Sequence, residues 1–595
     1  MKRLQRFFSL FILLASHVAF AHSGALFNVT ATGGAPGVLE FTLCLNGKGP
    51  LSCQHYEVNN LNLNITTTIP NHTYTTAGIK LKTPGYSLTG CTMIKNGYCL
   101  FTVSNNTVAT INITANNNTN LPWYPSLEAF EHYNSGRTHV FPQATFAGSM
   151  SGGNIINTVD SPACNLPYSV ECYPSGYNMS YLSPSLAYIY GGGYGNISGS
   201  VGAFVAQVNT TTLQPTWYNQ LIYTNNNGEW DYPGSLGILN DGYLYVSYGY
   251  RLTKLDPANG NIIATLVLPT GEGLPENTSF NGFNATSDGT IVMKSVYRQA
   301  GCPYQGPDAL LNCPDPSDVP PSILVSVNPK TMQKIDVITL SNPVGARPTI
   351  TQYNNQDYVY LLEATTAIRY KVQNGFFIKD VTWDPGTITL SGQTLCTSFV
   401  VVNDWVVAQT NTLPSATALS VISINQGDAS KQFSIQPFLG DTIPTYILDA
   451  FQTAADGSQA ISWAPMSVSG DPDTNLVYAS DALPGEIAAI QVSDSGLNII
   501  WKADQRTTEF TTLINPAASR VLVGTDIPNG QIPGNNQNDF AVWRNALTGI
   551  EIARSPLLPA MTQGTMIQPY YSGDMFYEGQ LGTLIKLSPT ALLKM

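Results

Sequence analysis

The sequence predicts an all-β protein, and three observations support this fold class. Of the 595 residues, 43% are hydrophobic and only 11% are charged, so the chain has ample apolar material for large cores. Glycine and proline number 51 and 39, which together exceed the ~12% average share. Short apolar segments alternate with these residues throughout the chain, which is typical of many short strands joined by turns. At ~100 to 200 residues per domain, the length indicates several domains or one long repeat array.

Residues 1–21 have the pattern of a secretory signal peptide. Basic residues precede the apolar stretch from Phe7 to Ala15, and Ala19-Phe20-Ala21 fits the small-x-small rule for cleavage. An uncleaved membrane anchor is the alternative, but the apolar stretch is much shorter than the ~20 residues that a spanning helix needs. We therefore expect an exported protein without a transmembrane span, located in the periplasm, at the cell surface or outside the cell.

The charge balance disfavours nucleic acid as a partner. Cleavage removes Lys2, Arg3 and Arg6, which leaves 23 of the 26 basic residues against 38 acidic ones and a net charge of -15. A protein of this charge repels phosphate backbones, and no cluster of lysines or arginines offsets the repulsion. We expect a monomer whose partner is an unidentified ligand or protein.

The nine cysteines form four near-neighbour pairs and one single residue. In an oxidising compartment such spacing predicts four local disulfides. Metal ligation is the alternative, but the sequence contains no Cys-x-x-Cys motif. Cys396 lies in an apolar run, where a buried, inert thiol is expected rather than a nucleophile. The pairs are Cys44 and Cys53, Cys91 and Cys99, Cys164 and Cys172, and Cys302 and Cys313.

Residues 22–115 are expected to form a small immunoglobulin-like β-sandwich, because alternating apolar and polar residues between turn signals give about seven short strands. Four motifs resemble an accessory module at the front of various exported bacterial proteins: Gly47-Lys-Gly-Pro-Leu-Ser-Cys53, Thr83-Pro-Gly-Tyr, Gly90-Cys91 and Gly97-Tyr-Cys99. That resemblance implies no chemistry of its own. Residues 116–164 are rich in Asn, Gly and Ser and are expected to be a linker, or a strap that packs on the repeats after it.

Across residues 165–595 one unit recurs: an apolar strand, a polar turn and a second apolar strand. The clearest copies surround the turns Asp256-Pro-Ala-Asn-Gly260, Asn328-Pro-Lys and Asn545-Ala-Leu-Thr-Gly549. Eight copies are spaced at intervals of about 54 residues, with two further candidate strands upstream of each copy. Four strands per repeat are typical of a propeller blade. The sequence therefore predicts an eight-bladed β-propeller, with seven blades as the alternative.

These repeats resemble those of quinoprotein-type, pyrroloquinoline-quinone-like propellers over roughly residues 165–595. The resemblance rests on alternating apolar residues and on Asp-Pro, Asn-Pro, Thr-Gly and Asn-Gly turns. It implies a tryptophan on the outer strand that docks on the next blade, for which Trp217, Trp383 and Trp501 are candidates. The adjacent cysteine pair of the family's dehydrogenases is absent. The sequence predicts no cofactor, and the resemblance leaves pyrroloquinoline quinone or calcium as alternatives.

The repeat region contains no recognisable catalytic motif. It has no histidine, because the last two, His132 and His139, lie in the expected linker or strap, where solvated side chains are expected. A Ser-His-Asp triad, a His-ligated zinc or a haem inside the propeller is therefore excluded unless one of these two histidines reaches it.

One segment, Asp471-Pro-Asp-Thr-Asn475, begins like a calcium-binding loop. Leu476 and Ala482 then stand where that loop needs Gly and Glu, so we expect a plain turn and no metal site.

The lack of catalytic motifs favours an exported binding or interaction protein over an enzyme. The alternatives are a quinone-dependent oxidoreductase and a carboxylate-metal hydrolase of the lactonase type, neither of which needs histidine.

We expect the functional surface on the face formed by the loops between second and third strands and by the loops that lead into first strands, because insertions in repeat proteins collect on the binding face. Two insertions lie there: Arg298 to Pro321, stapled by its cysteine pair, and Pro528 to Asp539, expected to be free to adapt. The polar residues expected to bind ligand near the channel mouth are Lys294, Arg347, Glu363, Gln409 and Glu578. The alternative is that these groups only satisfy one another and the exposed backbone of the channel.

Overall fold

The structure is a computed structural model, which describes nine strands between residues 24 and 115 and most of residues 122–591. The gaps in the second range are 163–172, 193–201, 223–231, 272–276, 298–318, 396, 411–417, 456–465 and 563. The expected signal peptide lies outside the described residues. The chain divides into two compact units, Met1–Asn117 and Asn118–Met595. No helix in the described part of the chain has the length and apolar character needed to cross a membrane.

The first unit contains two β-sheets. One has the strand order β4-β1-β9-β6, with β1 and β9 parallel, and the other has the order β3-β2-β5-β8-β7. Cys44 of β2 and Cys53 of β3 are direct cross-strand partners, whereas the other predicted cysteine pairs include residues outside the described ones. The strands are β1 (Gly24–Thr32), β2 (Leu39–Gly47), β3 (Ser52–Val58), β4 (Asn64–Pro70), β5 (Tyr74–Leu81), β6 (Tyr86–Thr89), β7 (Met93–Lys95), β8 (Tyr98–Thr102) and β9 (Val108–Ala115).

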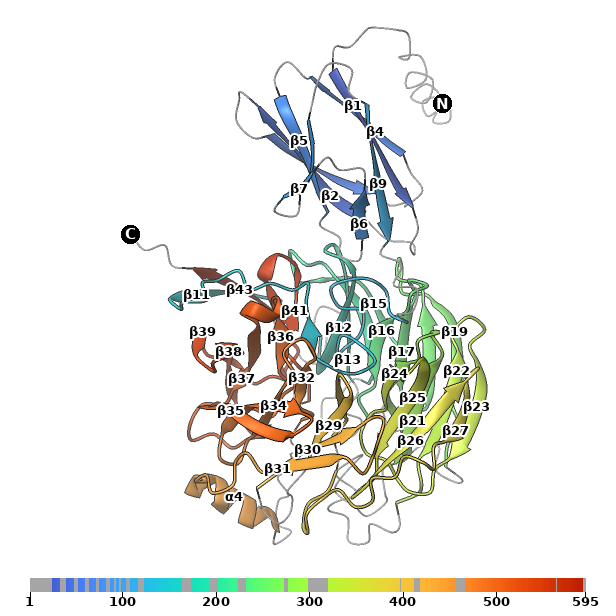
Figure 1. The fold of residues 1–595 in the computed structure, drawn as a ribbon, viewed down its shortest axis with the longest axis vertical. Helices are drawn as coiled ribbons and strands as arrows, with labels where there is room; N and C mark the ends of the chain where they lie inside the picture. The colour runs from blue at the N-terminus through green and yellow to red at the C-terminus, as the bar shows by residue number, and fades with distance from the viewer. Residues whose placement is uncertain are drawn as a thin grey trace. The chain divides into compact units, whose positions relative to one another are not determined.

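The second unit is an eight-bladed β-propeller, so eight blades rather than seven is the correct prediction. Its blades follow one another in chain order, as the change of colour from teal to red in Figure 1 shows. Blade 1 consists of β12 (Gly176–Ser183), β13 (Leu186–Gly191), β14 (Phe204–Val208) and β15 (Pro215–Gln220), and blade 2 of β16 (Ser235–Ile238), β17 (Leu244–Tyr248), β18 (Arg251–Leu255) and β19 (Ile262–Val267). Blade 3 consists of β20 (Thr278–Ala285), β21 (Ile291–Tyr297), β22 (Ile323–Asn328) and β23 (Gln333–Thr339), and blade 4 of β24 (Thr349–Tyr353), β25 (Gln356–Leu362), β26 (Ala367–Gln373) and β27 (Phe376–Lys379).

Blades 5 to 8 complete the circle. Blade 5 consists of β28 (Val400–Val402), β29 (Trp405–Gln409), β30 (Val421–Asn425) and β31 (Gln432–Ile435), and blade 6 of β32 (Ser469–Asp471), β33 (Leu476–Asp481), β34 (Glu486–Ser493) and β35 (Gly496–Asp504). Blade 7 consists of β36 (Thr512–Ile514), β37 (Val521–Asp526), β38 (Asn538–Asn545) and β39 (Glu551–Arg554), with β40 (Leu558–Pro559) beside β38. Blade 8 consists of β41 (Gln568–Pro569), β42 (Met575–Glu578), β43 (Leu584–Ala591) and β11 (Asn154–Asp160). A helix, α4 (Thr445–Ala455), lies between blades 5 and 6, and two 3-10 helices are Ala517–Ser519 and Tyr571–Gly573.

The first strand of each blade faces the channel. Consecutive first strands contact one another from β12 round to β41. The Met179 amide of β12 donates a 2.6 Å hydrogen bond to the Gln568 side chain of β41, which links blade 1 to blade 8. The strands therefore surround one central axis.

The recurring polar turns join the third and fourth strands of their blades. The Asp256 carboxylate accepts a hydrogen bond from the amide two residues later, and the Asn328 and Asn545 side chains accept from the amides two and three residues later. A short polar side chain that satisfies its own turn explains why Asp and Asn recur at this position.

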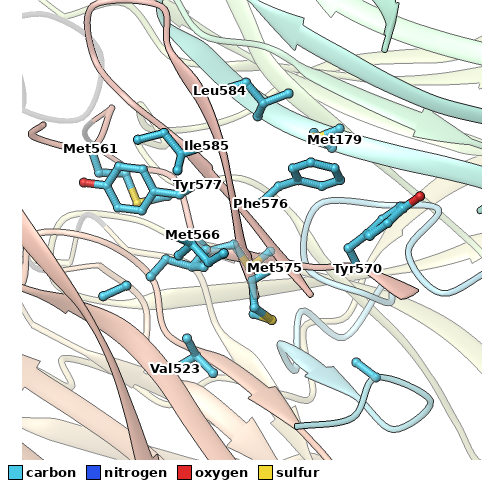
Figure 2. Close-up of a cluster of buried hydrophobic side chains, with 14 of the residues drawn as sticks. Met179, Val523, Met561, Met566, Tyr570, Met575, Phe576, Tyr577, Leu584 and Ile585 are labelled. Carbon is cyan, nitrogen blue, oxygen red and sulfur yellow. The ribbon is translucent and has the colours of Figure 1, made fainter. Parts of the chain in front are cut away.

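Blade 8 is closed by a strand from the other end of the propeller sequence. Every residue of β11 pairs with β43, from Asn154 opposite Ala591 to Asp160 opposite Ile585. Figure 1 shows the teal β11 beside the red β43. The seam contains the largest apolar cluster, which joins Ile156 of β11 and Met179 of blade 1 to side chains of blade 8; part of it is drawn in Figure 2.

The loops divide the propeller into two unequal faces. Loops from first to second and from third to fourth strands are tight turns, such as 184–185 and 354–355; we call this side the short face. The other side, which we call the long face, carries the segments between blades, such as 380–399 and 436–468, and the loops from second to third strands, which range from the two residues 249–250 to longer loops such as 527–537. The long face is the side on which the sequence predicts the functional surface.

Candidate functional site

A segment ahead of the first blade fills the channel of the propeller. Residues 122–146, which we call the plug, belong to the expected linker or strap. The plug includes Trp123, Leu127, Phe130 and Phe141, each no more than 5% exposed. Trp123 and Phe130 stack with ring centroids 4.0 Å apart. This segment therefore supplies the core around the propeller axis.

The plug is held by main-chain hydrogen bonds to the first strands of successive blades. Its carbonyl groups accept from the first strands of blades 1, 2, 4, 5, 6 and 7, and the Ser135 carbonyl accepts in addition from a side chain of blade 3. A short strand, β10 (Val140–Phe141), runs parallel to β36 and extends blade 7 inward. The donors are the amides of Tyr181, Ile238, Ile350, Val401, Gly470 and Leu513, and Nδ2 of Asn284.

Glu131 of the plug is the centre of a buried ion-pair network. Its carboxylate pairs with Arg347 and lies 3.3 Å from Nη1 of Arg137. Burial raises the pKa of the Glu131 carboxyl, but the neighbouring guanidinium groups, Arg347 first and then Arg137, outweigh burial and hold that pKa well below its usual range. The carboxylate is therefore ionised and anchors the plug to the propeller.

Arg347 connects the plug to three blades. It lies just before β24, and its guanidinium donates to the carbonyls of Gly234 at 2.9 Å, Pro233 at 3.2 Å and Asn281. The guanidinium carbon also lies 5.0 Å from the centre of the Tyr177 ring in blade 1. The predicted residue Arg347 is thus part of the channel network, at 7% exposure.

His132 and His139 are buried, which corrects the expectation of solvated side chains. Their rings stack at 4.5 Å, and both meet the edge of Phe510. Burial, followed by the charge of Arg137, lowers the pKa of His132 to about 3. Burial, followed by the proximity of His132, lowers the pKa of His139 well below its usual value. Both imidazoles are neutral and pack as aromatic rings, because they enter the channel with the plug.

A second group of acidic residues lies where blades 8 and 1 meet the plug. Glu128 of the plug and Glu578 at the end of β42 are completely buried, and burial raises the pKa of both carboxyl groups. The charge of Glu578 raises the pKa of Glu128 further. Tyr181 of β12 lies close enough to both for their charges to raise the pKa of its hydroxyl, after burial.

The other three predicted residues lie between neighbouring blades. Lys294 Nζ donates to the carbonyls of Val344 at 2.8 Å and Gly345 at 2.6 Å, in the segment that leads into blade 4. Gln409 donates to the carbonyl of Met466, in the segment that leads into blade 6. Each side chain therefore fixes the position of the next blade.

Glu363 differs in its partner, because it accepts a 2.9 Å hydrogen bond from the side chain of Asn342. All five predicted residues are buried, at 7% exposure or less, but only Arg347 and Glu578 lie beside the plug. Their role in binding stays a prediction.

The turn at Asp471–Asn475 is held by an arginine. Arg520, which is fully buried in blade 7, donates to both oxygens of Asp471 at 2.8 and 3.1 Å and to Asp473 at 2.7 Å. The two carboxylates therefore clamp blade 6 to blade 7.

The segment Pro528–Asp539, which the sequence predicts to be free to adapt, contains hydrogen bonds made by its own side-chain amides. The side-chain oxygen of Gln531 accepts hydrogen bonds from the amides of Gln537 at 2.7 Å and Asn538 at 3.2 Å. The Asn536 amide donates to Asp539 at 2.7 Å. Side-chain amides, whose partners composition does not reveal, fold the loop. The other insertion, 298–321, falls largely outside the described residues.

The acidic and basic residues of the plug are not among the residues predicted from the sequence. Glu128, Glu131 and Arg137 lie in a stretch whose Asn, Gly and Ser content indicates a linker. The available signal was the density of large apolar residues, with Trp123, Tyr124, Leu127, Phe130 and Tyr133 within eleven positions. A linker exposed to solvent has no need of so many aromatic side chains.

The outer-strand tryptophans dock on the neighbouring blade, as the resemblance implied. Trp217 donates to the carbonyl of Pro257 at 3.3 Å and Trp501 to that of Ala546 at 2.9 Å, each in the polar turn of the next blade. Trp383, just after β27, donates to Asn425 at 3.0 Å.

Comparison with known proteins gives a likeness of fold. No protein-family model and no curated protein sequence matches this chain. Among solved structures, it is similar to the quinohemoprotein alcohol dehydrogenase of Comamonas testosteroni, with a TM-score of 0.47, 11% identity and coverage of 77% of this chain and 80% of that one. BamB of Moraxella catarrhalis gives a TM-score of 0.43 and 10% identity, covering 73% of this chain and 100% of that one. At these scores the likenesses carry no inference about function.

Proposed function

We propose that this protein is an exported binding protein that presents the long face of its propeller to a ligand or a protein partner. The observation that carries the proposal is the plug, which occupies the channel and bonds to the first strands of seven blades. A surface for a partner is then found on the loops rather than along the axis. Export rests on the signal-peptide pattern of residues 1–21.

Two features support the long face as the binding side. It carries the longest segments of the propeller, such as 380–399 and 436–468, beside short loops such as 579–583, whereas the short face has only short turns, of which those at Asn328 and Asn545 are fixed by their own side chains. Loops on a rigid scaffold are where binding residues concentrate. Of the predicted residues, Glu363, Gln409 and Glu578 lie at the ends of second strands and Arg347 lies before a first strand. Lys294 lies within the second strand β21 and donates to the segment that leads into blade 4. These positions suit residues that hold the loops in place.

Site-specific photo-crosslinking in cells tests which face binds. A photoreactive residue at Leu581, 77% exposed in a long-face loop of blade 8, is expected to crosslink to one defined partner. The matched control is Ile550, 64% exposed in a short-face turn of blade 7, where no such product is expected. Equal crosslinking at both positions, or a product at Ile550 alone, would contradict the proposal.

The oxidoreductase alternative is tested separately. Purified protein incubated with pyrroloquinoline quinone and calcium is expected to leave an artificial electron-accepting dye unreduced when alcohols or aldehydes are added. Dye reduction that depends on both the quinone and the substrate would replace the binding proposal with an enzymatic one.

A further inference from the structure

Glu128 and Glu578 stand out among the buried carboxyl groups of the propeller. In the described part of the protein, no group donates a hydrogen bond to either oxygen of either side chain. Buried polar atoms almost always have a partner. Glu509, which is equally buried, accepts hydrogen bonds from the Thr508 hydroxyl at 2.9 Å and the Thr565 amide at 3.1 Å. The protein therefore supplies partners to Glu509, as it does to Glu131 and Glu363, and leaves Glu128 and Glu578 unsatisfied.

The two glutamates come from distant parts of the chain, and both lie beside β12 of blade 1. The Glu128 carbonyl accepts a 2.7 Å hydrogen bond from the amide of Tyr181 in blade 1. The carboxyl carbon of Glu578 in blade 8 lies 3.5 Å from the position that a Cβ on Gly176 would take. Plug, first blade and last blade thus converge here.

A third polar group at this place also has no partner. The Tyr181 hydroxyl is fully buried, and no described residue forms a hydrogen bond with it. It is near enough to Glu128 and Glu578 to be affected by the charge of each. Three side chains that are near enough to affect one another's charge therefore bury oxygen atoms without a hydrogen-bond partner among the described residues.

The cations of the channel are already occupied. Arg137 and Arg347 pair with Glu131, and Lys294 donates to two main-chain carbonyls. Nor do the two carboxyl groups form a hydrogen bond with each other through which they could share a proton. No other described His, Cys, Asp or Glu completes a group of three that could hold a metal.

We propose that Glu128, Glu578 and Tyr181 bind one hard divalent cation of the calcium class, which ties the plug to the seam between blades 1 and 8. Two carboxylates supply two negative charges, which match the charge of such an ion, and the phenol adds a neutral oxygen. Calcium accepts irregular sets of oxygen ligands and completes its coordination with water. The proposal does not depend on the function proposed above.

Metal analysis and thermal unfolding of the full mature protein test the proposal. Protein purified without chelator is expected to contain about one calcium per chain, and dialysis against chelator is expected to lower Tm. Addition of calcium chloride alone should restore Tm, because a ligand that binds only the folded state stabilises it. A metal-free protein whose Tm is the same with and without calcium would overturn the proposal.

Variants assign the effect to this site. Glu128→Gln and Glu578→Gln are expected to weaken calcium binding at least about tenfold, because substitution of residues that only support metal ligands already lowers metal affinity by about this factor. Tyr181→Phe, which keeps the ring, should weaken it less. Glu509→Gln is the matched control: a buried glutamate whose oxygens already have partners, so calcium should still restore its Tm. Calcium dependence unchanged in Glu128→Gln and Glu578→Gln would place the ion elsewhere and refute the assignment.

Discussion

Glu131 shows how much the plug depends on a single side chain. Two buried guanidinium groups, those of Arg137 and Arg347, pair with its carboxylate. Arg347 also donates hydrogen bonds to the carbonyl of Gly234, just before blade 2, and to that of Asn281, in the first strand of blade 3. Removing one member of a buried charge network is costly because the remaining charges stay desolvated. The network is therefore strong only while all three members are present.

We expect Glu131→Gln to lower the free energy of unfolding of the protein by about 3 to 5 kcal/mol, because two buried guanidinium groups lose their counter-charge. Denaturant unfolding measures the loss. The control is Asp494→Asn, which removes an 81%-exposed partner of Lys431 and should cost less than about 1 kcal/mol. A loss in Glu131→Gln no larger than that of the control would show that the network does not stabilise the fold.

Asp481 gives the stability of blade 6 a defined pH dependence. Burial, and after it the charges of Asp441 and Glu486, raises its pKa from 3.8 to about 7, although the hydrogen bond that the carboxylate accepts from the Leu483 amide opposes this rise. A carboxyl group whose pKa is raised by folding binds its proton more tightly in the folded state. It therefore stabilises at low pH, and this contribution is lost as the pH rises from about 4 through 7.

In Asp481→Asn the decline in stability between pH 4 and 8 should become shallower by about 2 to 4 kcal/mol, at ~1.4 kcal/mol per pKa unit. The Asn side chain keeps an oxygen for the Leu483 amide, so the fold is preserved. Unfolding at several pH values tests this, with Asp494→Asn as the exposed control. Parallel pH profiles for wild type and Asp481→Asn would refute it.

At the scale of elements, neighbouring blades are joined by a repeated contact between an outer-strand indole and a glycine in the next turn. The Gly549 backbone has φ +74°, and a Cβ there would lie 2.7 Å from the Trp501 ring. Gly260 has the same relation to Trp217, with a Cβ at 2.6 Å. The glycine of the turn is thus required twice, for its backbone conformation and for the ring that covers it.

Gly549→Ala should destabilise the protein by about 1 to 3 kcal/mol more than Gly530→Ala. Both variants strain the backbone, but only the new methyl group at position 549 also overlaps with the Trp501 ring. Gly530 has a similar φ of +87°, but a Cβ there meets nothing within 4 Å, so it carries the strain alone. Thermal or denaturant unfolding of both variants measures the difference. Equal losses would mean that the indole moves aside and that the contact is not selective for glycine.

The repeat hairpins could be predicted from the sequence because their signals are local. A turn such as Asp256–Gly260 is specified by residues that bond to each other within five positions. The docking tryptophans could be predicted from the same repeats, and the blade number from the count of these turns.

The plug could not be predicted in this way, because nothing within it reports its partners. Glu131 is paired with Arg347, 216 residues away, and the Ser135 carbonyl accepts from Ile350. Composition indicates a linker here, although the aromatic residues of the segment indicate burial. Of the predicted site residues, Arg347 and Glu578 lie beside the plug, while Lys294, Gln409 and Glu363 bond to neighbouring segments instead.

At the scale of the whole molecule, two segments from before the first blade complete the propeller. The plug fills the axis, and β11 supplies the outer strand of blade 8. Ile156 of β11 is buried in the seam, and the Asn154 side chain reaches the carbonyl of Ile552 in blade 7 at 2.8 Å. Without β11, the β43 edge would be left unpaired, which exposes a sheet edge to other chains.

Three truncated chains separate these two contributions. We expect residues 118–595 to unfold cooperatively with the midpoint of the propeller transition in the full protein, since they contain the whole second unit. Residues 147–595 retain β11 but lose the plug, so the first strands lose their inner hydrogen-bond partners and the midpoint should fall. Residues 162–595 lose β11 as well and should aggregate or unfold without a cooperative transition, because blade 8 then has three strands and an open edge. Calorimetry and size-exclusion chromatography distinguish the three cases. A chain of residues 162–595 as stable as residues 118–595 would show that the propeller closes without its first two segments.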